Sequence, residues 1–241
     1  MKHKHISKLV LVAAFWLFSC ADVERNSPYD SDGINYGGKD PVKALGKGND
    51  IANYRTVQIG EQVWMAENLD YRVLFSRCYD NKESNCKTYG RLYTWATAMN
   101  LPIICNKISC SSQISANHRG ICPEGWHIPS KEDWDELVRA VGSLGRNLKA
   151  VSGWKQNGSG EDRYGFSALP GGRGNPAGGS SMVDPYISTF NDVGERGTWL
   201  SSSEYSDVFA YDRNMTYYEV NAINRGYIRK LDLFSVRCVM D

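Results

Sequence analysis

The feature that most constrains the fold of this chain is a set of six cysteines that follows residue 50. They are Cys78, Cys86, Cys105, Cys110, Cys122 and Cys238, and a seventh, Cys20, stands apart near the N-terminus. An even number of cysteines in an exported chain indicates disulfide bonds. Six cysteines allow fifteen pairings, so the fold must select one set by bringing the right sulfur atoms together.

The spacing of these cysteines favours one pairing. Cys78 with Cys86, and Cys105 with Cys110, each bracket a short polar segment and would close a small loop. The two that remain, Cys122 and Cys238, would then tie the middle of the chain to its last strand. The rival interpretation is a zinc site or a reactive thiol. Neither a C-x₂-C pair nor a histidine at ligand spacing supports zinc, so we expect no metal and no cofactor.

The N-terminus has the pattern of an export signal. A basic start is followed by an unbroken run of ten apolar residues from Leu9 to Phe18. Ten residues span about 15 Å as a helix, roughly half of a hydrocarbon core, so the run predicts a signal peptide rather than a membrane span. Residues 17–20, Leu-Phe-Ser-Cys, resemble a bacterial lipobox. This resemblance implies that residues 1–19 are removed and that Cys20 is lipidated. The alternative is a plain secretory signal with an incidental cysteine.

The residues after Cys20 suggest where the protein is delivered and how it is organised. Ala21 stands where an aspartate would signal inner-membrane retention, so we expect an outer-membrane lipoprotein that contacts the membrane through acyl chains. Residues 20–50 are polar and lack apolar periodicity, which predicts a flexible tether behind the lipidated cysteine. Residues 51–241 are expected to form one mixed domain.

Within that domain, four segments have clear local patterns. Residues 54–65 alternate around Gly60 and predict a hairpin. Residues 89–99 and 130–141 place apolar side chains at helical spacing, and Ser130 with Asp133 fits a capping box. Residues 234–239 alternate like a terminal strand with one core face. The glycine-rich stretch 153–197 is expected to be dominated by loops. Short strands, sparse helices and long loops held by cross-links indicate an α+β module.

Charge and histidine content exclude several function classes. The chain has 28 Lys and Arg against 27 Asp and Glu, and three of the lysines precede Cys20. A nearly neutral body argues against nucleic acid as a partner, because binding nucleic acid needs clustered cations. Only His118 and His127 follow the first five residues. Such scarcity makes histidine-rich metal sites and histidine-based triads hard to build.

Six ordered strings together point to a family. They are IGEQVWMAENL (59–69), YGRLYTW (89–95), CPEGWHIPS (122–130), GFSALPGGR (165–173), WLSSS (199–203) and FSVRCV (234–239). In this order they closely resemble the Fibrobacter succinogenes major paralogous domain, a family of exported bacterial modules. The resemblance covers nearly all of residues 54–241. Thr198 departs from the family pattern, which often has a second tryptophan there, and residues 174–188 look like an insertion.

The resemblance also implies a fold. The family is similar to a branch of the C-type lectin-like fold related to formylglycine-generating domains. That similarity implies two helices flanking a small twisted antiparallel sheet, with long loops and with termini close together. A disulfide between Cys122, just before the second helix, and Cys238, in the last strand, would span the fold. This agrees with the pairing that the spacing favours.

Most of the conspicuous motif residues are expected to be structural. The tryptophans of the motifs carry large burial energies and are predicted to lie in the core: Trp64, Trp95, Trp126, Trp134 and Trp199. His127 is predicted to be a structural histidine with satisfied hydrogen bonds. Ser201–Ser203 lack a Gly-x-Ser-x-Gly elbow, which disfavours a nucleophile.

Residues 205–229 are the candidate ligand-binding segment, because they combine tyrosines with asparagines and arginines. Rigid amphipathic rings and adaptable hydrogen-bonding groups are what binding surfaces use, and such rings stack on sugars. The candidate ligand-binding residues are Tyr205, Tyr211, Arg213, Tyr217, Arg225 and Tyr227. The alternative is a solvated sheet face with half-buried tyrosines. Calcium-dependent sugar binding is not expected, because the usual Glu-Pro-Asn and Trp-Asn-Asp strings are missing.

Two function classes follow from these observations. The leading hypothesis is a lipid-anchored, non-catalytic surface module that binds polysaccharide or a surface protein. The alternative is a formylglycine-generating-like oxidase, which would need reactive cysteines. The state of the cysteines therefore discriminates between the two classes.

Overall fold

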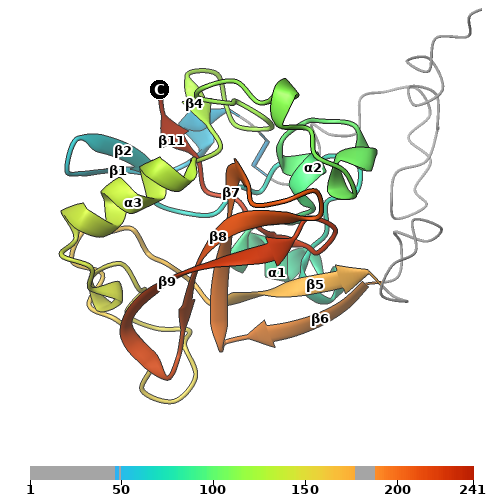
Figure 1. The fold of residues 1–241 in the computed structure, drawn as a ribbon. Helices are drawn as coiled ribbons and strands as arrows, with labels where there is room; N and C mark the ends of the chain where they lie inside the picture. The colour runs from blue at the N-terminus through green and yellow to red at the C-terminus, as the bar shows by residue number, and fades with distance from the viewer. Residues whose placement is uncertain (1–46, 49, 177–187) are drawn as a thin grey trace, which may run out of the picture.

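The computed structural model describes residues 47–48, 50–176 and 188–241. The predicted signal peptide 1–19, the predicted lipidation site Cys20 and most of the predicted tether lie outside the described residues, as does most of the predicted insertion. Within the described ranges, none of the helices combines the length and the hydrophobicity that crossing a bilayer requires. The structure is mostly sheet with a few short helices, so the predicted mixture of helices and strands is confirmed (Figure 1).

A four-stranded sheet joins the two ends of the domain. Its order is β1 (Thr56–Ile59), β2 (Gln62–Met65), β11 (Val239–Met240) and β4 (Trp126–His127). The predicted hairpin is confirmed, since β1 and β2 are antiparallel and Gly60 turns between them with a φ of +62°. Val239 pairs with Trp64, so the last strand completes a sheet that the first hairpin begins.

A five-stranded sheet forms the C-terminal half of the domain. Its order is β3 (Leu92–Tyr93), β10 (Phe234–Ser235), β7 (Arg196–Glu204), β8 (Phe209–Thr216) and β9 (Glu219–Arg229). The implied all-antiparallel core needs one correction, because β10 runs parallel to β7. The glycine-rich stretch is also more ordered than predicted: β5 (Gly171–Pro176) and β6 (Ser188–Val193) form an antiparallel pair there.

Helix α3 (Lys131–Ala140) matches its prediction. The Ser130 side chain accepts from the backbone N–H of Asp133, and the Asp133 carboxylate accepts from the backbone N–H of Ser130, which is the predicted capping box. Trp134 and Leu137 are buried on its inner face. Local pattern and tertiary burial agree in this helix.

The prediction of a helix over residues 89–99 is wrong. Helix α1 (Glu83–Tyr89) ends there, β3 follows, and α2 (Trp95–Ala98) is a single turn. Gly90 adopts a φ of +75°, and a Cβ at this position would lie 2.7 Å from the Cβ of Asn68. The chain therefore turns sharply at Gly90, and β3 enters the large sheet instead of continuing a helix.

The prediction of one alternating strand over residues 234–239 is also wrong. The strand divides into β10 and β11, which belong to different sheets. Every residue from Phe234 to Val239 is buried, because both faces of this segment are covered. Short 3₁₀ helices complete the secondary structure: η2 (Ile51–Asn53), η3 (Tyr79–Asn81), η4 (Ile103–Asn106), η5 (Ser111–Gln113) and η6 (Gly145–Asn147).

The three disulfides have the predicted pairing. Cys78 bonds Cys86, Cys105 bonds Cys110, and Cys122 bonds Cys238 across 116 residues of sequence. The long-range bond lies in a core cluster with Trp95 and Trp126, while a second cluster contains the other three motif tryptophans. The tryptophans predicted for the core are all at most 3 % exposed. Cross-links and tryptophan packing thus hold a domain with little helix.

Candidate functional site

Asn68 connects the motifs in the core. Its Oδ1 accepts a hydrogen bond from Trp199 Nε1 at 2.8 Å and two from the Arg237 guanidinium at 2.8 and 3.1 Å. Its Nδ2 donates to the carbonyl oxygen of Tyr89. Four of the six motifs therefore meet at one buried amide. These motif residues stabilise the fold and present no reactive group to solvent.

His127 has the structural role predicted for it. Its Nδ1 lies 2.7 Å from Asp241 Oδ1, and its Nε2 lies 3.3 Å from Asp133 Oδ2. Burial by itself would lower the pKa of His127, but the hydrogen bonds to the two carboxylates outweigh it and raise that pKa. The imidazole thus links the last residue of the chain to the first turn of α3.

The serine run 201–203 lies in β7, the strand that precedes the first candidate tyrosine, Tyr205. Trp95 Nε1 donates to the Ser201 carbonyl at 3.0 Å, and Trp134 Nε1 donates to the Leu200 carbonyl at 3.3 Å. The pairing of β7 with β8 shifts between Leu200 and Glu204. Backbone groups of β7 therefore bond to tryptophans of α2 and α3 at this irregularity. The serines thus lie in the irregular stretch of β7.

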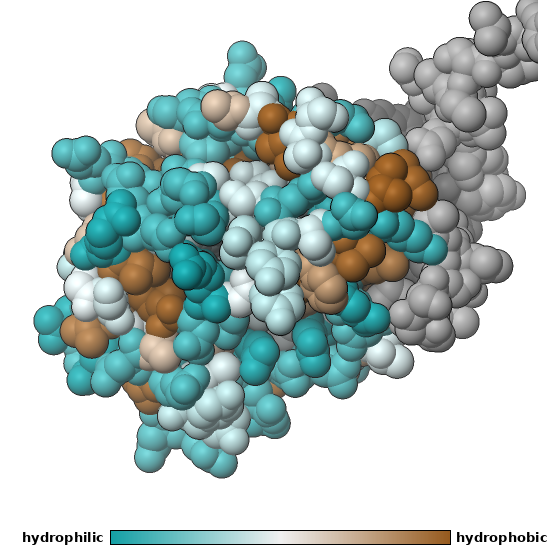
Figure 2. All heavy atoms as spheres, in the orientation of Figure 1, coloured by the Kyte–Doolittle hydropathy of each residue, from teal (hydrophilic) through white to brown (hydrophobic). Residues whose placement is uncertain are grey.

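Beyond this irregular stretch, four aromatic side chains form an exposed cluster, which we call the tyrosine platform: Tyr205, Phe209, Tyr211 and Tyr227. The rings of Tyr205 and Tyr227 are stacked, with centroids 4.6 Å apart and planes inclined by 6°. Tyr211 packs edge-on against Tyr205, and Phe209 packs edge-on against Tyr227. The side chains of Tyr205 and Tyr227 are 51 % and 57 % exposed. Figure 2 shows pale side chains of intermediate hydropathy in the middle of the face in front of these strands.

Strand register explains why residues distant in sequence meet in the tyrosine platform. Tyr211 of β8 pairs with Tyr227 of β9, and Arg213 pairs with Arg225 two residues further along. Side chains two residues apart on a strand point to the same face. Four of the six candidate binding residues therefore share one face of the sheet. Tyr205 joins them through the turn after β7, where its N–H donates to the carbonyl of Phe209.

The two candidate arginines play different parts. Arg213 is 3 % exposed and forms a short ion pair with Asp135 of α3, so it attaches the helix to the sheet. Burial lowers the pKa of Arg213, while Asp135 opposes that shift. The Arg225 side chain is 56 % exposed, and its Nη1 lies 3.8 Å from Asp135 Oδ2. Arg225 is thus the candidate cation that a ligand beside the platform can reach.

Tyr217 lies apart from the other candidates. It follows β8 at the far end of the hairpin, where its ring packs edge-on against Tyr218. Its backbone also closes over Gly158, where a Cβ would lie 2.6 Å from the Tyr217 carbonyl oxygen. Tyr217 therefore packs against the loop that contains Gly158 and is not part of the tyrosine platform.

One buried cation near the tyrosine platform, Lys230, was not predicted from the sequence. Lys230 is fully buried, 4.4 Å from the Trp95 ring centroid, and its Nζ lies 2.6 Å from Glu204 Oε1. The Glu204 carboxylate also accepts from Ser109 and from the backbone N–H of Cys110. Glu204 therefore holds the Cys105–Cys110 loop beside Tyr205. Lys230 directly follows the candidate segment 205–229, and a single lysine at that position does not indicate such a role.

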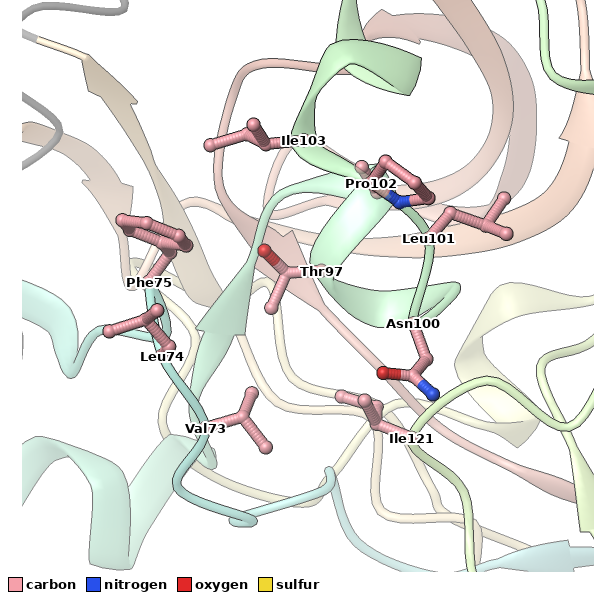
Figure 3. A pocket seen from close by; sticks show the side chains of 10 residues that line it. Val73, Leu74, Phe75, Thr97, Asn100, Leu101, Pro102, Ile103 and Ile121 are labelled. Atoms are coloured by element: carbon pink, nitrogen blue, oxygen red, sulfur yellow. The ribbon is translucent and has the colours of Figure 1, made fainter. Parts of the chain in front are cut away.

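An apolar pocket of about 390 Å³ lies beside α2. Figure 3 shows Val73, Leu74 and Phe75 on one side and Leu101 with Ile103 on the other. Thr97 and Asn100 supply its polar side chains. None of the described residues that line this pocket has a titratable side chain.

Within the part of the chain that the structure describes, one arrangement has the residue types of a metal site. Cys78, Glu83 and Cys86 lie close enough together to share an ion. The two cysteines are bonded to each other, however, so their sulfur atoms are not thiolates that could ligate a metal. Among the described residues, all six cysteines are in disulfides.

Comparison with known proteins agrees with the motifs described above. The sequence matches the Fibrobacter succinogenes major domain over residues 57–240, a range that contains all six motifs. No curated protein and no solved structure matches the chain. Because the match spans most of the sequence and nearly all of the described structure, the chain belongs to the Fibrobacter succinogenes major domain family.

Proposed function

We propose that this protein is a lipid-anchored, non-catalytic module that binds polysaccharide at the outer membrane through the tyrosine platform. The observation that carries the proposal is the pair of stacked, half-exposed rings of Tyr205 and Tyr227. Burying such rings would stabilise a folded protein, so leaving two of them accessible suits a surface that stacks against sugar rings. Arg225 adds an exposed donor beside them.

The rigidity of the tyrosine platform supports a binding role. Tyr205 follows Glu204, whose carboxylate is held by Lys230 and by the Cys105–Cys110 loop. Tyr227 lies near the C-terminal end of β9, opposite Tyr211. Rings fixed in this way lose little conformational entropy when a ligand binds, which favours affinity.

The chemistry of the cysteines supports a non-catalytic module over the oxidase alternative. Oxidation by a formylglycine-generating-like mechanism needs a reactive thiol, and the six cysteines of the described residues are consumed in disulfides. The sulfur atoms of Cys122 and Cys238 are also fully buried in the core. The proposal therefore assigns these cysteines to stability.

The same proposal includes a C-type lectin-like fold. Three features support it: the end strands β2 and β11 pair, α2 and α3 lie against β7, and a disulfide connects the segment before α3 to the last strand. In such folds the loops and strands before the last strand commonly carry the ligand. The tyrosine platform lies in that region of this chain.

Anchoring is tested by mass spectrometry of the mature protein. The lipobox-like residues 17–20 predict an acylated N-terminal Cys20 and loss of residues 1–19. Cleavage at another position with an unmodified Cys20 would refute the lipid anchor and leave a plainly secreted domain. This outcome would not affect the proposed binding surface.

Binding is tested by pull-down on insoluble cellulose and by a panel of soluble glycans. Tyr205→Ala and Tyr227→Ala should each weaken binding by about 1–3 kcal/mol, the usual effect of losing a central aromatic contact. Tyr218→Ala is the matched control, because Tyr218 is 64 % exposed but lies at the other end of the hairpin. Unchanged binding by both platform variants would place the site elsewhere. Binding to a protein but to no glycan would identify the surface-partner alternative.

A further inference from the structure

A second, polar pocket lies on the opposite face of β7–β9 from Arg213 and Arg225. It has a volume of about 350 Å³, within the range of small-molecule sites. Its floor consists of side chains that alternate with the platform positions along the strands: Arg196 and Thr198 from β7, Asp212 and Asn214 from β8, and Gly226 and Ile228 from β9. Phe209 and Tyr227 also line it, so the pocket and the platform share an edge.

Two of the three arginines in the pocket wall already have a carboxylate partner. Arg173 lies 3.0 Å from Asp192, and Arg229 lies 2.7 Å from Asp232. Arg196 differs, because no described residue forms a hydrogen bond or an ion pair with its guanidinium. Arg196 and Asp212 are therefore the two charged groups of the pocket that can still form hydrogen bonds with a ligand.

Asp212 is the buried polar group that faces this pocket. The residue is 2 % exposed, and its Oδ2 accepts a hydrogen bond from Asn214 Nδ2 at 2.7 Å. No donor to Oδ1 occurs among the described residues. A Cβ on Gly226 would lie 2.7 Å from Oδ1, so glycine at this position lets the carboxylate lie directly against β9. Oδ1 is not among the fully enclosed side-chain atoms that lack a partner, so it is an acceptor that a donor in the pocket can reach.

We propose that this pocket binds one neutral pyranose residue of the polysaccharide that crosses the tyrosine platform, which rests on the proposed function. A sugar hydroxyl both donates and accepts, so it can donate to Asp212 Oδ1 and accept from Arg196. Thr198 and Asn214 offer further hydrogen bonds, and the Tyr227 edge gives the sugar chain a route to the stacked rings. A uronate is disfavoured because its carboxylate would lie beside that of Asp212, and a cationic ligand is disfavoured by Arg196, which has no carboxylate partner among the described residues.

The test is a titration of the isotopically labelled protein with single sugars, followed by NMR. The probes are methyl glycosides of neutral hexoses and, as the acidic counterpart, glucuronate, each at millimolar concentrations. Neutral glycosides should shift the backbone amide signals of Thr198, Asn214 and Gly226. Asp212→Asn should weaken that binding at least about tenfold while the variant stays folded and melts at a higher temperature at neutral pH. Asp207→Asn, an exposed carboxylate in the β7–β8 turn, is the matched control and should bind as the parent does.

The outcomes separate this inference from the proposed function. Absence of shifts at the three amides with every sugar would overturn the pocket proposal, and so would unchanged affinity in Asp212→Asn or preferential binding of glucuronate. If platform variants still lose polysaccharide binding in those cases, the proposed function stands without the pocket. If sugars shift the pocket amides while Tyr205→Ala and Tyr227→Ala bind polysaccharide normally, the pocket stands and the platform does not.

Discussion

Replacing Asp212 with asparagine is expected to stabilise the protein at neutral pH and to leave its stability nearly unchanged in acid. Burial raises the pKa of Asp212 to about 6, against the smaller opposing effects of Asn214, Arg213 and Arg196. The folded state therefore holds the proton more tightly than the unfolded state. The stability that Asp212 contributes is complete below its unfolded pKa and is lost as the pH rises through about 6.

The size of the effect follows from the shift in pKa. Moving the pKa from 3.8 to about 6 changes it by roughly two units. Each unit corresponds to about 1.4 kcal/mol, so ionising Asp212 costs the folded state up to about 3 kcal/mol above pH 7. The charged groups that surround it are Arg213 on its own strand, Arg196 on β7 and Arg173, Arg229 and Asp232 in the pocket wall. Asparagine keeps the shape and the acceptor for Asn214 but carries no charge.

The assay compares free energies of unfolding from chemical denaturation, with disulfides intact, between about pH 4 and pH 8. The difference between Asp212→Asn and the parent should grow by about 2–3 kcal/mol over this range. Titration of other groups cancels in that difference. Asp207→Asn should change stability by less than about 0.5 kcal/mol at every pH, because an exposed carboxylate gains no desolvation relief.

A difference that is constant across the pH range would refute the reasoning, because it would mean that Asp212 titrates alike in the folded and unfolded states. A variant less stable than the parent at pH 8 would refute it more strongly. That result would mean that the ionised carboxylate stabilises the fold through contacts with the surrounding arginines. In either case there would be no loss of stability at Asp212 for ligand binding to explain.

Three other expectations concern the scaffold. Replacing Cys122 and Cys238 together with serine should lower the free energy of unfolding by up to about 5 kcal/mol in denaturant titrations, because this bond closes the longest loop; equal stability would contradict the entropic argument. His127→Gln should cost about 1.5–3 kcal/mol near pH 5, and the cost should shrink as the pH rises through the raised pKa of His127; a loss independent of pH would contradict the charged pairing with its carboxylates. Glu204→Gln should destabilise the protein by about 3–5 kcal/mol, since it leaves Lys230 buried without a counter-charge, and thermal melting would measure this; a stable variant would show that Lys230 relaxes to solvent.

Segments whose structure depends on local rules were predictable from the sequence. The hairpin over 54–65 needs only alternation around Gly60, and α3 needs only Ser130, Asp133 and an apolar stripe. The disulfide pairing was also predictable from the sequence. Two pairs of cysteines are separated by only a few residues, so each pair closes a short loop and leaves Cys122 to bond with Cys238. In these segments, the residues that determine the local conformation are close together in the sequence.

The errors arose where a distant segment decides the outcome. Residues 89–99 have helical spacing, yet Gly90 must turn because Asn68 lies against it, and β3 pairs with β10 from the other end of the chain. Residues 234–239 alternate, yet this segment passes from one sheet to another and is covered on both sides. Hydrophobic periodicity indicates which face of a single helix or strand is buried. It cannot indicate that another segment of the chain also covers the opposite face.

The candidate site divides in the same way. Composition alone identified the tyrosine- and arginine-rich segment, and strand alternation could have grouped Tyr211 with Arg213 and Tyr227 with Arg225. The tertiary structure decided that Tyr205 stacks on Tyr227, that Tyr217 lies elsewhere, and that Arg213 is occupied by Asp135. It alone placed Asp212 in a pocket opposite Gly226. Residue type and spacing set what a segment can do locally, whereas burial, charge pairing and the irregular stretch of β7 depend on contacts between residues far apart in the chain.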